Sequence, residues 1–340
     1  MTETIVLQTE QKDLLQGSLD TAQDTINNLK ALKEFKDYDH FTFDLDRTIL
    51  FAGKTNDTGS RIDIFESENS NWRTVSTYNE ENIQITGLTF DEKNRLVYAV
   101  SRGSVSVTVF KLSDDWTLEM IDQVIHRSEE ETSPEPHQVK ISPDGGWIIV
   151  TDRSTDCIYT YELVKGIVLR EVARVQLGED FDISGFAFHP HLNIAYAVSR
   201  LRGEILTMEY DPKDGSFSPF LNMSTLGESA LGEDQAEENQ AAQKMIIDSK
   251  GNYIYVLNQK NPSIAVYNIH PKAGATQLQQ VYRLDQTQQP FDLYLTSDDR
   301  HLIVSYLNQA TGTLLNSETQ AGQLVNEREL PLHDHQIRFL

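Results

Sequence analysis

The feature that most constrains this chain is an internal repeat. Six segments share one pattern, in which alternating apolar residues lead into a polar turn and then into a β-branched and aromatic run: FTFDLDRTILFAGKT, LTFDEKNRLVYAVSR, VKISPDGGWIIVTDR, FAFHPHLNIAYAVSR, MIIDSKGNYIYVLNQ and LYLTSDDRHLIVSYL. Alternation of this kind on both sides of a turn is typical of a β-hairpin. The sequence therefore predicts six hairpins in series.

The hairpins recur at a nearly constant spacing, about 47 to 51 residues with one longer gap of about 59. The second strands are expected to begin near these residues: Ile49, Leu96, Trp147, Ile194, Tyr253 and Leu302. Most hairpins are followed by two further apolar runs, which gives four strands per repeat. Four-stranded repeats of this length are typical of propeller blades.

A seventh repeat is expected from the two ends of the chain. At about 49 residues each, the 340 residues correspond to seven repeats, and the segments TIVLQTEQ, LLQGSLDT and HQIRFL can complete the last one. We therefore predict an all-β fold, a seven-bladed β-propeller with four-stranded antiparallel blades, as a single domain over residues 1–340. The ring would be closed by N- and C-terminal strands that share a blade, which leaves no free sheet edge.

Three segments need a separate interpretation. Residues 12–36 could instead form an amphipathic helix, because their leucines and Ile26 have loosely helical spacing. Residues 225–240 are polar, acidic and poor in β-forming residues, so we expect an acidic surface loop there. The acidic run from Glu129 to Glu131 is expected to be an exposed connector, with a basic partner as the alternative.

Charge and composition exclude several functional classes. The chain has 29 Lys and Arg against 52 Asp and Glu, a formal net charge of −23, which would repel nucleic acid and anionic lipid. No stretch approaches the ~18 apolar residues of a membrane span, so we expect neither partner. No phosphate-loop, dinucleotide or serine-hydrolase motif occurs, and no cofactor is expected.

Cysteine and histidine usage adds two expectations. The lone Cys157 excludes a disulfide framework within the chain and fits a reducing compartment, and with no secretory pattern at the start we expect a cytoplasmic protein. Cys157 itself is expected to be a small buried side chain. The pairs His189 with His191 and His333 with His335 lack the further ligands of a metal site, so we expect no metal and assign them to solvated turns.

The repeat places a set of polar residues on one expected face. In a propeller blade, the loops that enter the first strand and leave the second lie on the same face, the usual ligand site. Arg102, Arg153 and Arg200 follow the second strand at equivalent positions in three repeats. With His137 and His40 nearby, they predict a local positive site for a carboxylate or phosphate. The alternative is that each arginine pairs with a surface carboxylate such as Asp152 or Glu204.

The segment PEPHQVKISPDGGWIIVTDRSTDCIYTYEL resembles the lactonase family of seven-bladed propellers, which includes 6-phosphogluconolactonase and the carboxymuconate lactonizing enzyme. The segments FAFHPHLNIAYAVSRLRGEILTMEY, AAQKMIIDSKGNYIYVLNQKNPSIAVY and LPLHDHQIRFL fit the same family, so the resemblance covers essentially the whole chain. It implies hydrolysis of a sugar lactone, most directly 6-phosphogluconolactone in the pentose phosphate pathway, and thus a role in carbohydrate metabolism.

The functional positions depart from the family. The resemblance implies a catalytic His after Pro on the third inner strand, and His137 matches it. The family's Gly-Pro-Arg-His is Asp182 to Gly185 here, and its Asn-Glu-Leu is Ser199 to Leu201. Its Ala-Glu and Asn-Arg are Ala242–Gln243 and Asn258–Gln259. Of the four residues that the resemblance expects to carry the chemistry, only His137 remains.

These substitutions lead to a functional prediction. Lactone opening needs a general base and groups that stabilise the developing oxyanion; loss of the base typically costs about 10² to 10⁴ in rate and loss of one oxyanion donor about 10² to 10³. We expect weak or no lactonase activity, with a small anionic sugar acid or phosphate, or a lactone, still bound. Whether the chain is an enzyme or a pseudoenzyme stays open, as does its oligomeric state.

The expected ligand-binding residues are Arg102, Arg153, Arg200, His40, Ser184, Gln243 and Gln259. His137 is the one expected catalytic residue, and no carboxylate is expected near it. A non-catalytic propeller that uses its surface for protein interaction is the alternative function.

Overall fold

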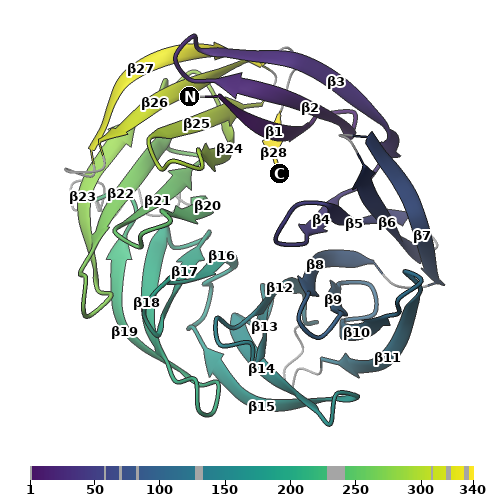
Figure 1. Ribbon diagram of the computed structural model, residues 1–340. Coiled ribbons are helices and arrows are strands. Elements are labelled where there is room, and N and C mark those ends of the chain that lie inside the picture. Colours follow the sequence, from purple (N-terminus) through teal and green to yellow (C-terminus); the bar gives the residue numbers. More distant parts are fainter. Residues whose placement is uncertain are drawn as a thin grey trace. The chain divides into compact units, whose positions relative to one another are not determined.

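The computed structural model of the chain describes residues 2–56, 59–68, 71–81, 84–126, 133–227, 242–307, 309–318, 323–332 and 337–340. Within these ranges all regular structure is β, and strands β1 to β28 form seven four-stranded antiparallel sheets (Figure 1). We call these sheets blades 1 to 7 in chain order, the last being the one that contains both chain ends. The predicted all-β fold with four-stranded antiparallel blades is confirmed.

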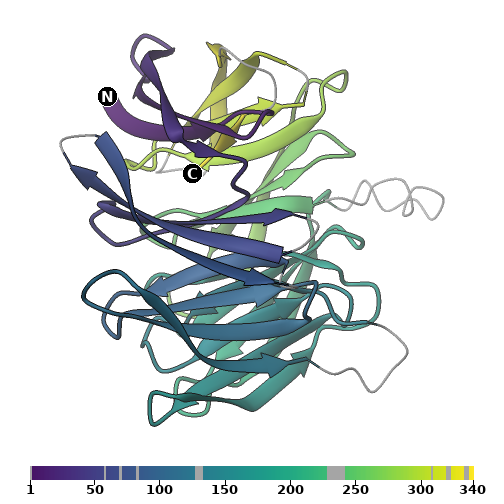
Figure 2. The same ribbon diagram turned by 90° about the vertical axis from the view of Figure 1, so that its right-hand side faces the viewer.

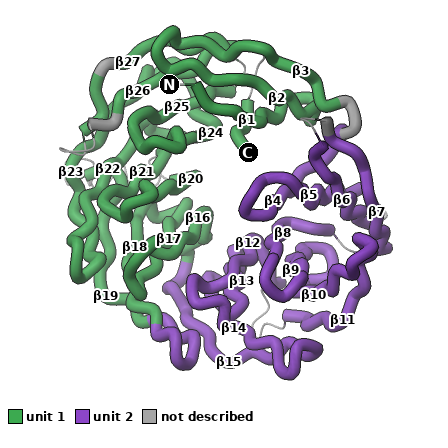
Figure 3. The backbone as a smooth tube through the Cα atoms, in the orientation of Figure 1, with its two compact units in different colours: residues 1–33, 180–210, 218–340 green, residues 34–179, 211–217 purple. Residues whose placement is uncertain are grey.

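The chain divides into two compact units, which are described separately (Figure 3). Unit 2 consists of Glu34–Glu179 and Asp211–Phe217 and holds blades 1 to 3. The strands of blade 1 are β4 (His40–Phe43), β5 (Ile49–Asn56), β6 (Gly59–Glu68) and β7 (Asn71–Glu81). Those of blade 2 are β8 (Ile85–Asp91), β9 (Leu96–Ser101), β10 (Ser106–Leu112) and β11 (Leu118–Ile125). Those of blade 3 are β12 (Pro136–Ile141), β13 (Ile148–Asp152), β14 (Cys157–Val164) and β15 (Val168–Gln176).

Unit 1 consists of Met1–Lys33, Asp180–Tyr210 and Ser218–Leu340 and holds the other four blades. The strands of blade 4 are β16 (Ile183–Phe188), β17 (Ile194–Ser199), β18 (Glu204–Tyr210) and β19 (Phe217–Ser224). Those of blade 5 are β20 (Ala242–Ile247), β21 (Tyr253–Asn258), β22 (Ser263–Ile269) and β23 (Thr276–Arg283). Those of blade 6 are β24 (Pro290–Leu295), β25 (His301–Tyr306), β26 (Thr311–Glu318) and β27 (Gln323–Pro331).

Blade 7 joins the two ends of the chain, as predicted. Its strands are β28 (Arg338–Phe339), β1 (Thr2–Gln8), β2 (Asp13–Asp20) and β3 (Thr25–Lys36), and β28 pairs with β1 antiparallel through Leu7 and Phe339 (Figures 1 and 2). The alternative of a helix over residues 12–36 is wrong. The whole of β1 pairs with β2, so the backbone groups of this segment are satisfied by a ladder, and Leu14 and Leu19 are buried in the sheet.

The hairpin positions follow the repeat closely. The second strands of blades 1 to 6 begin at the predicted residue or within one residue of it. They are also the most buried: β9, β13, β17 and β21 are buried along their whole length, as expected for strands that pack on both faces against apolar layers. None of the described residues belongs to a helix that is long and apolar enough to cross a membrane.

The first strand of five blades carries a β-bulge one residue after its start. In blades 2 to 6 the pairing with the second strand skips one residue, and the skipped residues are Thr86, His137, Ser184, Gln243 and Phe291. A bulge bends the strand and redirects the side chain of the extra residue. Each of these first strands therefore presents one side chain in a direction that the regular pleat would not allow.

Candidate functional site

The bulges carry three of the predicted site residues. His137, Ser184 and Gln243 are the bulged residues of blades 3, 4 and 5, and each is half-buried. His40 begins β4 and pairs with Gly53 without a bulge. Bulges are common next to functional sites because they re-aim a side chain. The sequence identified these residues, but not the backbone feature that distinguishes them.

The three arginines occupy equivalent backbone positions, as predicted. The N–H groups of Arg102, Arg153 and Arg200 each donate a 3.0 Å hydrogen bond to the carbonyl of the residue two positions before the bulge, which is Gln84, Glu135 and Asp182, respectively. Gln259 follows the second strand in blade 5. The predicted residues are divided between the units: unit 2 holds His40, Arg102, His137 and Arg153, and unit 1 holds Ser184, Arg200, Gln243 and Gln259 (Figure 3).

In unit 2 the polar groups meet at Glu135, which sequence reasoning missed. Its carboxylate lies 3.4 Å from Arg102 Nη1 and accepts a 3.4 Å hydrogen bond from the hydroxyl of Ser154, while its carbonyl accepts from the N–H of Arg153. Glu135 is two residues before His137 in the chain, a carboxylate that sequence reasoning did not consider. The adjacent residues in the segment PEPH were the available signal.

The Arg102–Glu135 pair is open to solvent. The two side chains are 61% and 31% exposed, and ion pairs of this kind contribute little to stability because water screens them. An incoming anion could therefore compete with Glu135 for Arg102 at small cost. The alternative that the arginines pair with carboxylates therefore holds for Arg102, with Glu135 as the partner. Asp152, which the sequence offered as a possible surface partner, is fully buried.

Asp152 supports the bulge of blade 3 from inside the sheet. It lies directly opposite Pro136, and its Oδ1 accepts 3.0 Å hydrogen bonds from the N–H groups of Glu135 and Thr155. His126 Nδ1 lies 3.5 Å from its Oδ2, and His126 Nε2 is 2.7 Å from the Tyr161 hydroxyl. Burial disfavours the charged carboxylate, but His126 and the backbone N–H donors outweigh it and hold the pKa of Asp152 below its usual value.

In unit 1, Arg200 is held by a carboxylate. Arg200 Nε donates a 2.7 Å hydrogen bond to Asp182 Oδ2, and Nη2 donates to the same oxygen. The Asp182 backbone has a φ of +46°, a conformation that glycine adopts freely and other residues rarely. The family resemblance aligns a glycine here. The carboxylate that engages Arg200 thus occupies a position where glycine would be unstrained, and the expected partner Glu204 is replaced by Asp182.

The Ser184 hydroxyl serves a structural role. It donates to the carbonyl of Ala242 at 2.7 Å, as the Thr86 hydroxyl of blade 2 donates to the carbonyl of Pro136 at 2.6 Å. In both cases a bulged hydroxyl bridges to the residue before the next bulge. Gln243 differs, because its Oε1 is buried and has no hydrogen-bond partner among the residues that the structure describes. A polar group of this kind is available to a ligand or water.

Cys157 and His189 are both buried. The Cys157 Sγ donates to Gln176 Oε1, and burial raises the pKa of the thiol, so the predicted buried side chain is confirmed. The expectation that His189 is solvated is wrong, although His191 is exposed. His189 Nδ1 accepts from the N–H groups of His191 and Leu192, and its Nε2 contacts the carbonyl of Gly251 at 3.0 Å.

Several predicted features lie partly or wholly outside the described residues. Glu129 to Glu131, His333 and His335 are among them, as is most of the acidic segment 225–240. The described start of that segment is not a surface loop. Thr225 is fully buried, and its hydroxyl contacts Asn258 Oδ1 at 2.8 Å.

Comparison with known proteins gives the evolutionary context. The family model described as "Lactonase, 7-bladed beta-propeller" matches residues 4–334. An uncharacterized protein of Lactococcus lactis is 24% identical over 285 residues, covering 82% of this chain and 81% of that protein. The 6-phosphogluconolactonase of Bacillus subtilis is 26% identical over 231 residues, covering 66% of this chain and 63% of that enzyme. A periplasmic gluconolactonase of Pseudomonas aeruginosa has the same fold, with a TM-score of 0.83 at 15% identity over 100% of this chain and 99% of that one.

Proposed function

Because the chain belongs to the lactonase family of seven-bladed β-propellers, we propose that it binds a small anionic sugar acid or sugar phosphate, with lactone hydrolysis weak or absent. The observation that carries this proposal is the pair Arg102–Glu135 beside the His137 bulge. It offers an exposed guanidinium whose present partner is weakly held, next to the one retained family residue. A guanidinium of this kind suits a carboxylate or phosphate.

The same arrangement argues against efficient hydrolysis. Arg200 is engaged by Asp182, and the Ser184 hydroxyl is used in a bond to the carbonyl of Ala242. The Ser184 hydroxyl therefore has no free hydrogen for an oxyanion, and Asp182 fixes the direction of the Arg200 guanidinium. Oxyanion donors must be in place before the reaction. We propose a cytoplasmic protein of carbohydrate metabolism, in keeping with the lone Cys157 and with the activity of the Bacillus subtilis relative.

Turnover is tested first. Hydrolysis of 6-phosphogluconolactone and of gluconolactone is followed for the wild type and for His137→Ala, against the spontaneous rate. We expect both proteins to remain within about tenfold of the spontaneous rate, since three of the four residues that the family resemblance expects to carry the chemistry are missing. Fast turnover that His137→Ala abolishes would overturn the proposal and make the chain an ordinary lactonase.

Binding is tested by calorimetry with 6-phosphogluconate and gluconate. Arg102→Ala should weaken binding about tenfold, because a hydrogen bond to a charged group is worth about 1.5–3 kcal/mol. Glu135→Gln should strengthen it, because the competitor for Arg102 is removed. Arg170→Ala is the matched control: Arg170 lies on β15 of the same unit, is 65% exposed and pairs with Glu162. An equal loss in both arginine variants would exclude a site at Arg102.

The second candidate function is a platform for protein interaction. The observation in its favour is that Arg102 and Arg200 both have carboxylate partners, so neither needs a ligand to balance its charge. Absence of binding by any sugar acid, phosphate or lactone in the same calorimetry would favour this candidate over the first.

A further inference from the structure

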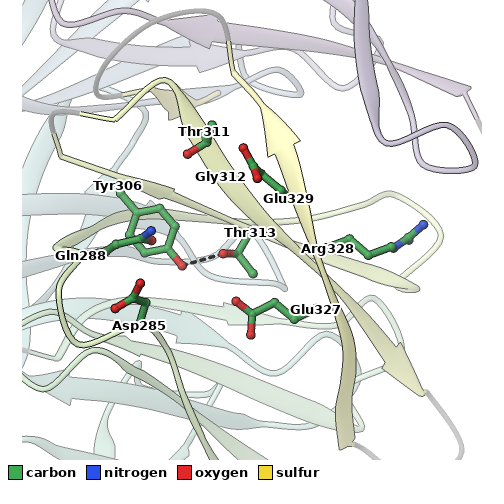
Figure 4. Close-up of a pocket in the computed structure, with 9 residues that line it drawn as sticks. All are labelled: Asp285, Gln288, Tyr306, Thr311, Gly312, Thr313, Glu327, Arg328 and Glu329. Atoms are coloured by element: carbon green, nitrogen blue, oxygen red, sulfur yellow. Dashed lines mark hydrogen bonds between the residues drawn. The ribbon is translucent and has the colours of Figure 1, made fainter.

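A cavity of about 590 Å³ opens in unit 1, in blade 6 and the loop that precedes it (Figure 4). Its wall is formed by the loop after β23, the end of β25, and strands β26 and β27. None of the residues expected from the sequence to bind a ligand lines it. The cavity is therefore a separate candidate site, and its polar groups indicate what it could hold.

Three carboxylates give the cavity its charge: Asp285, Glu327 and Glu329. The one basic lining residue, Arg328, does not offset them, because its Nη1 lies 2.7 Å from Asp24 and its side chain points away from the other lining residues (Figure 4). Glu327 accepts a 2.7 Å hydrogen bond from the Tyr282 hydroxyl, whereas Glu329 has no hydrogen bond or ion pair with any residue that the structure describes. The cavity thus favours a cation.

A buried hydroxyl pair provides a second, independent signal. Tyr306 and Thr313 are 2% and 7% exposed, and their hydroxyl oxygens are 2.7 Å apart in the cavity wall (Figure 4). A bond between two hydroxyls uses only one of their two hydrogens. The other hydrogen has no acceptor within the described part of the chain. Each hydroxyl has the other as its partner, and the remaining hydrogen can be donated to a ligand or to water in the cavity.

Two further properties define the neutral part of the cavity. The Gln288 side chain, which can donate and accept, makes no hydrogen bond to another described residue. Burial is the main cause that raises the pKa of Tyr306 to about 12; the Thr313 hydroxyl opposes this rise, and the charges of Glu327 and Asp285 add to it. The phenol therefore keeps its proton at neutral pH. The wall therefore combines anionic acceptors with neutral groups that suit alcohols.

We propose that this cavity binds an amino sugar, with its ammonium group at Glu327 and Glu329 and its hydroxyls at Gln288 and the Tyr306–Thr313 pair. The cavity volume accommodates a sugar ring. A bare metal ion fits less well, because within the described ranges no group of three or more His, Cys, Asp or Glu side chains is arranged to hold one. A neutral sugar would leave the carboxylates without a counter-charge, and a simple polyamine would leave the hydroxyl pair and Gln288 unused.

Titration calorimetry of the full chain with three sugars tests the ligand class. Glucosamine carries the ammonium group, N-acetylglucosamine has the same ring without the charge, and glucose lacks the nitrogen. We expect glucosamine to bind at least about tenfold more tightly than the other two, since each loses a charge-assisted contact. Equal binding of all three, or no binding of glucosamine, would overturn the proposal, as would spermidine binding more tightly than glucosamine.

Variants locate the site. Glu329→Gln should weaken glucosamine binding about fivefold or more and leave glucose unaffected, whereas Thr313→Val should weaken all three sugars. Glu209→Gln is the control, because Glu209 is an exposed glutamate on β18 of the same unit and has no hydrogen-bond or ion-pair partner among the described residues. Circular dichroism and melting curves monitor folding. If Thr313→Val does not fold, the exposed Glu329→Gln still decides, and an unchanged affinity in that variant would exclude this cavity.

Discussion

Blades 3 and 4 share a β-bulge in their first strand, but a different polar side chain lies opposite the start of that strand. In both, the first strand bulges after one residue, at His137 and at Ser184. The arginine after the second strand donates its N–H to the carbonyl of the residue just before the first strand. Opposite the strand start, blade 3 has the buried carboxylate Asp152, and blade 4 has the hydroxyl of Ser199 at the same register position.

The difference shows how the repeat separates geometry from chemistry. Asp152 is charged and receives two backbone N–H groups, whereas Ser199 donates to the carbonyl of Phe181 and accepts from the N–H of Arg202. Both hold the bulge in place. The pairing of the strands fixes the backbone, so the side chains at the bulge and at the end of the second strand can change without loss of the fold. A change in these side chains can also change which ligand is bound.

The largest expected effect on stability comes from replacing the two side chains opposite the strand starts, Asp152 and Ser199. Asp152→Ala should lower the free energy of unfolding by about 3 kcal/mol, because it leaves two backbone N–H groups without their acceptor and removes the buried carboxylate beside His126. Ser199→Ala should cost about 1 kcal/mol, since it removes neutral hydrogen bonds only. Urea unfolding of both variants and the wild type measures the difference.

Asp152→Asn separates charge from geometry, because it keeps an acceptor for the backbone N–H groups and removes the negative charge beside His126. We expect a loss between those of the two alanine variants. Equal losses of unfolding free energy for Asp152→Ala and Ser199→Ala would mean that the charge of Asp152 adds no stability beyond that of a neutral hydrogen-bonding side chain.

The next comparison concerns the hairpin turn of blade 3 and that of blade 5, which contacts the turn of blade 4. Gly145 in blade 3 has a φ of +72° with open space around it, whereas Gly251 has a φ of +69° and a Cβ there would lie 2.5 Å from the His189 ring in the turn of blade 4. Gly145→Ala should cost about 1 kcal/mol from backbone strain alone. Gly251→Ala should cost about 1–3 kcal/mol more, because His189 must move. Melting of the two variants side by side checks this, and equal shifts would show that His189 adapts freely.

As the pH falls, the stabilising contribution of His189 in blade 4 should be lost before that of Asp152 in blade 3. Burial lowers the pKa of His189, so its stabilising contribution is present above the unfolded pKa of about 6.5 and decreases as pH falls below it. Protonation of Nδ1 would break its bonds with two backbone N–H groups. The pKa of Asp152 is lowered instead, so its contribution is present above about pH 3.9 and is lost only below that.

His189→Asn tests whether His189 causes the loss of stability at mildly acidic pH. The amide oxygen of the asparagine does not titrate but can still accept hydrogen bonds from the N–H groups of the turn. We expect the unfolding free energy of the wild type to decrease between about pH 7.5 and pH 5.5 by at most about 1.4 kcal/mol per pH unit from this proton. The variant should show a shallower dependence, with His301, whose pKa burial also lowers, as the remaining contributor. Identical slopes would contradict a role for His189.

The sequence was sufficient to predict the positions of the strands but not the contacts between their side chains. The repeat located the second strands because a half-buried hairpin must alternate apolar and polar residues. Glu135 was missed because its partner Arg102 is 33 residues away in the chain and meets it only when blades 2 and 3 pack. The cavity of blade 6 combines three strands and a loop, and no local pattern marks such a combination. The bulges were missed because one skipped residue leaves the alternation almost unchanged.

The smallest expected effect concerns the arginines themselves. Arg102→Ala should change the free energy of unfolding by less than about 0.5 kcal/mol, since Arg102 is 61% exposed and its 3.4 Å contact with Glu135 is screened. Arg200→Ala should cost about 1 kcal/mol, because two guanidinium nitrogens engage the nearly buried Asp182. A double-mutant cycle on Arg102 and Glu135 measures the first coupling. A coupling above about 1 kcal/mol would make Arg102 a structural residue like Arg200 and would remove the reason to expect an anion there, whereas a coupling near zero leaves Arg102 the arginine that is free to change partner.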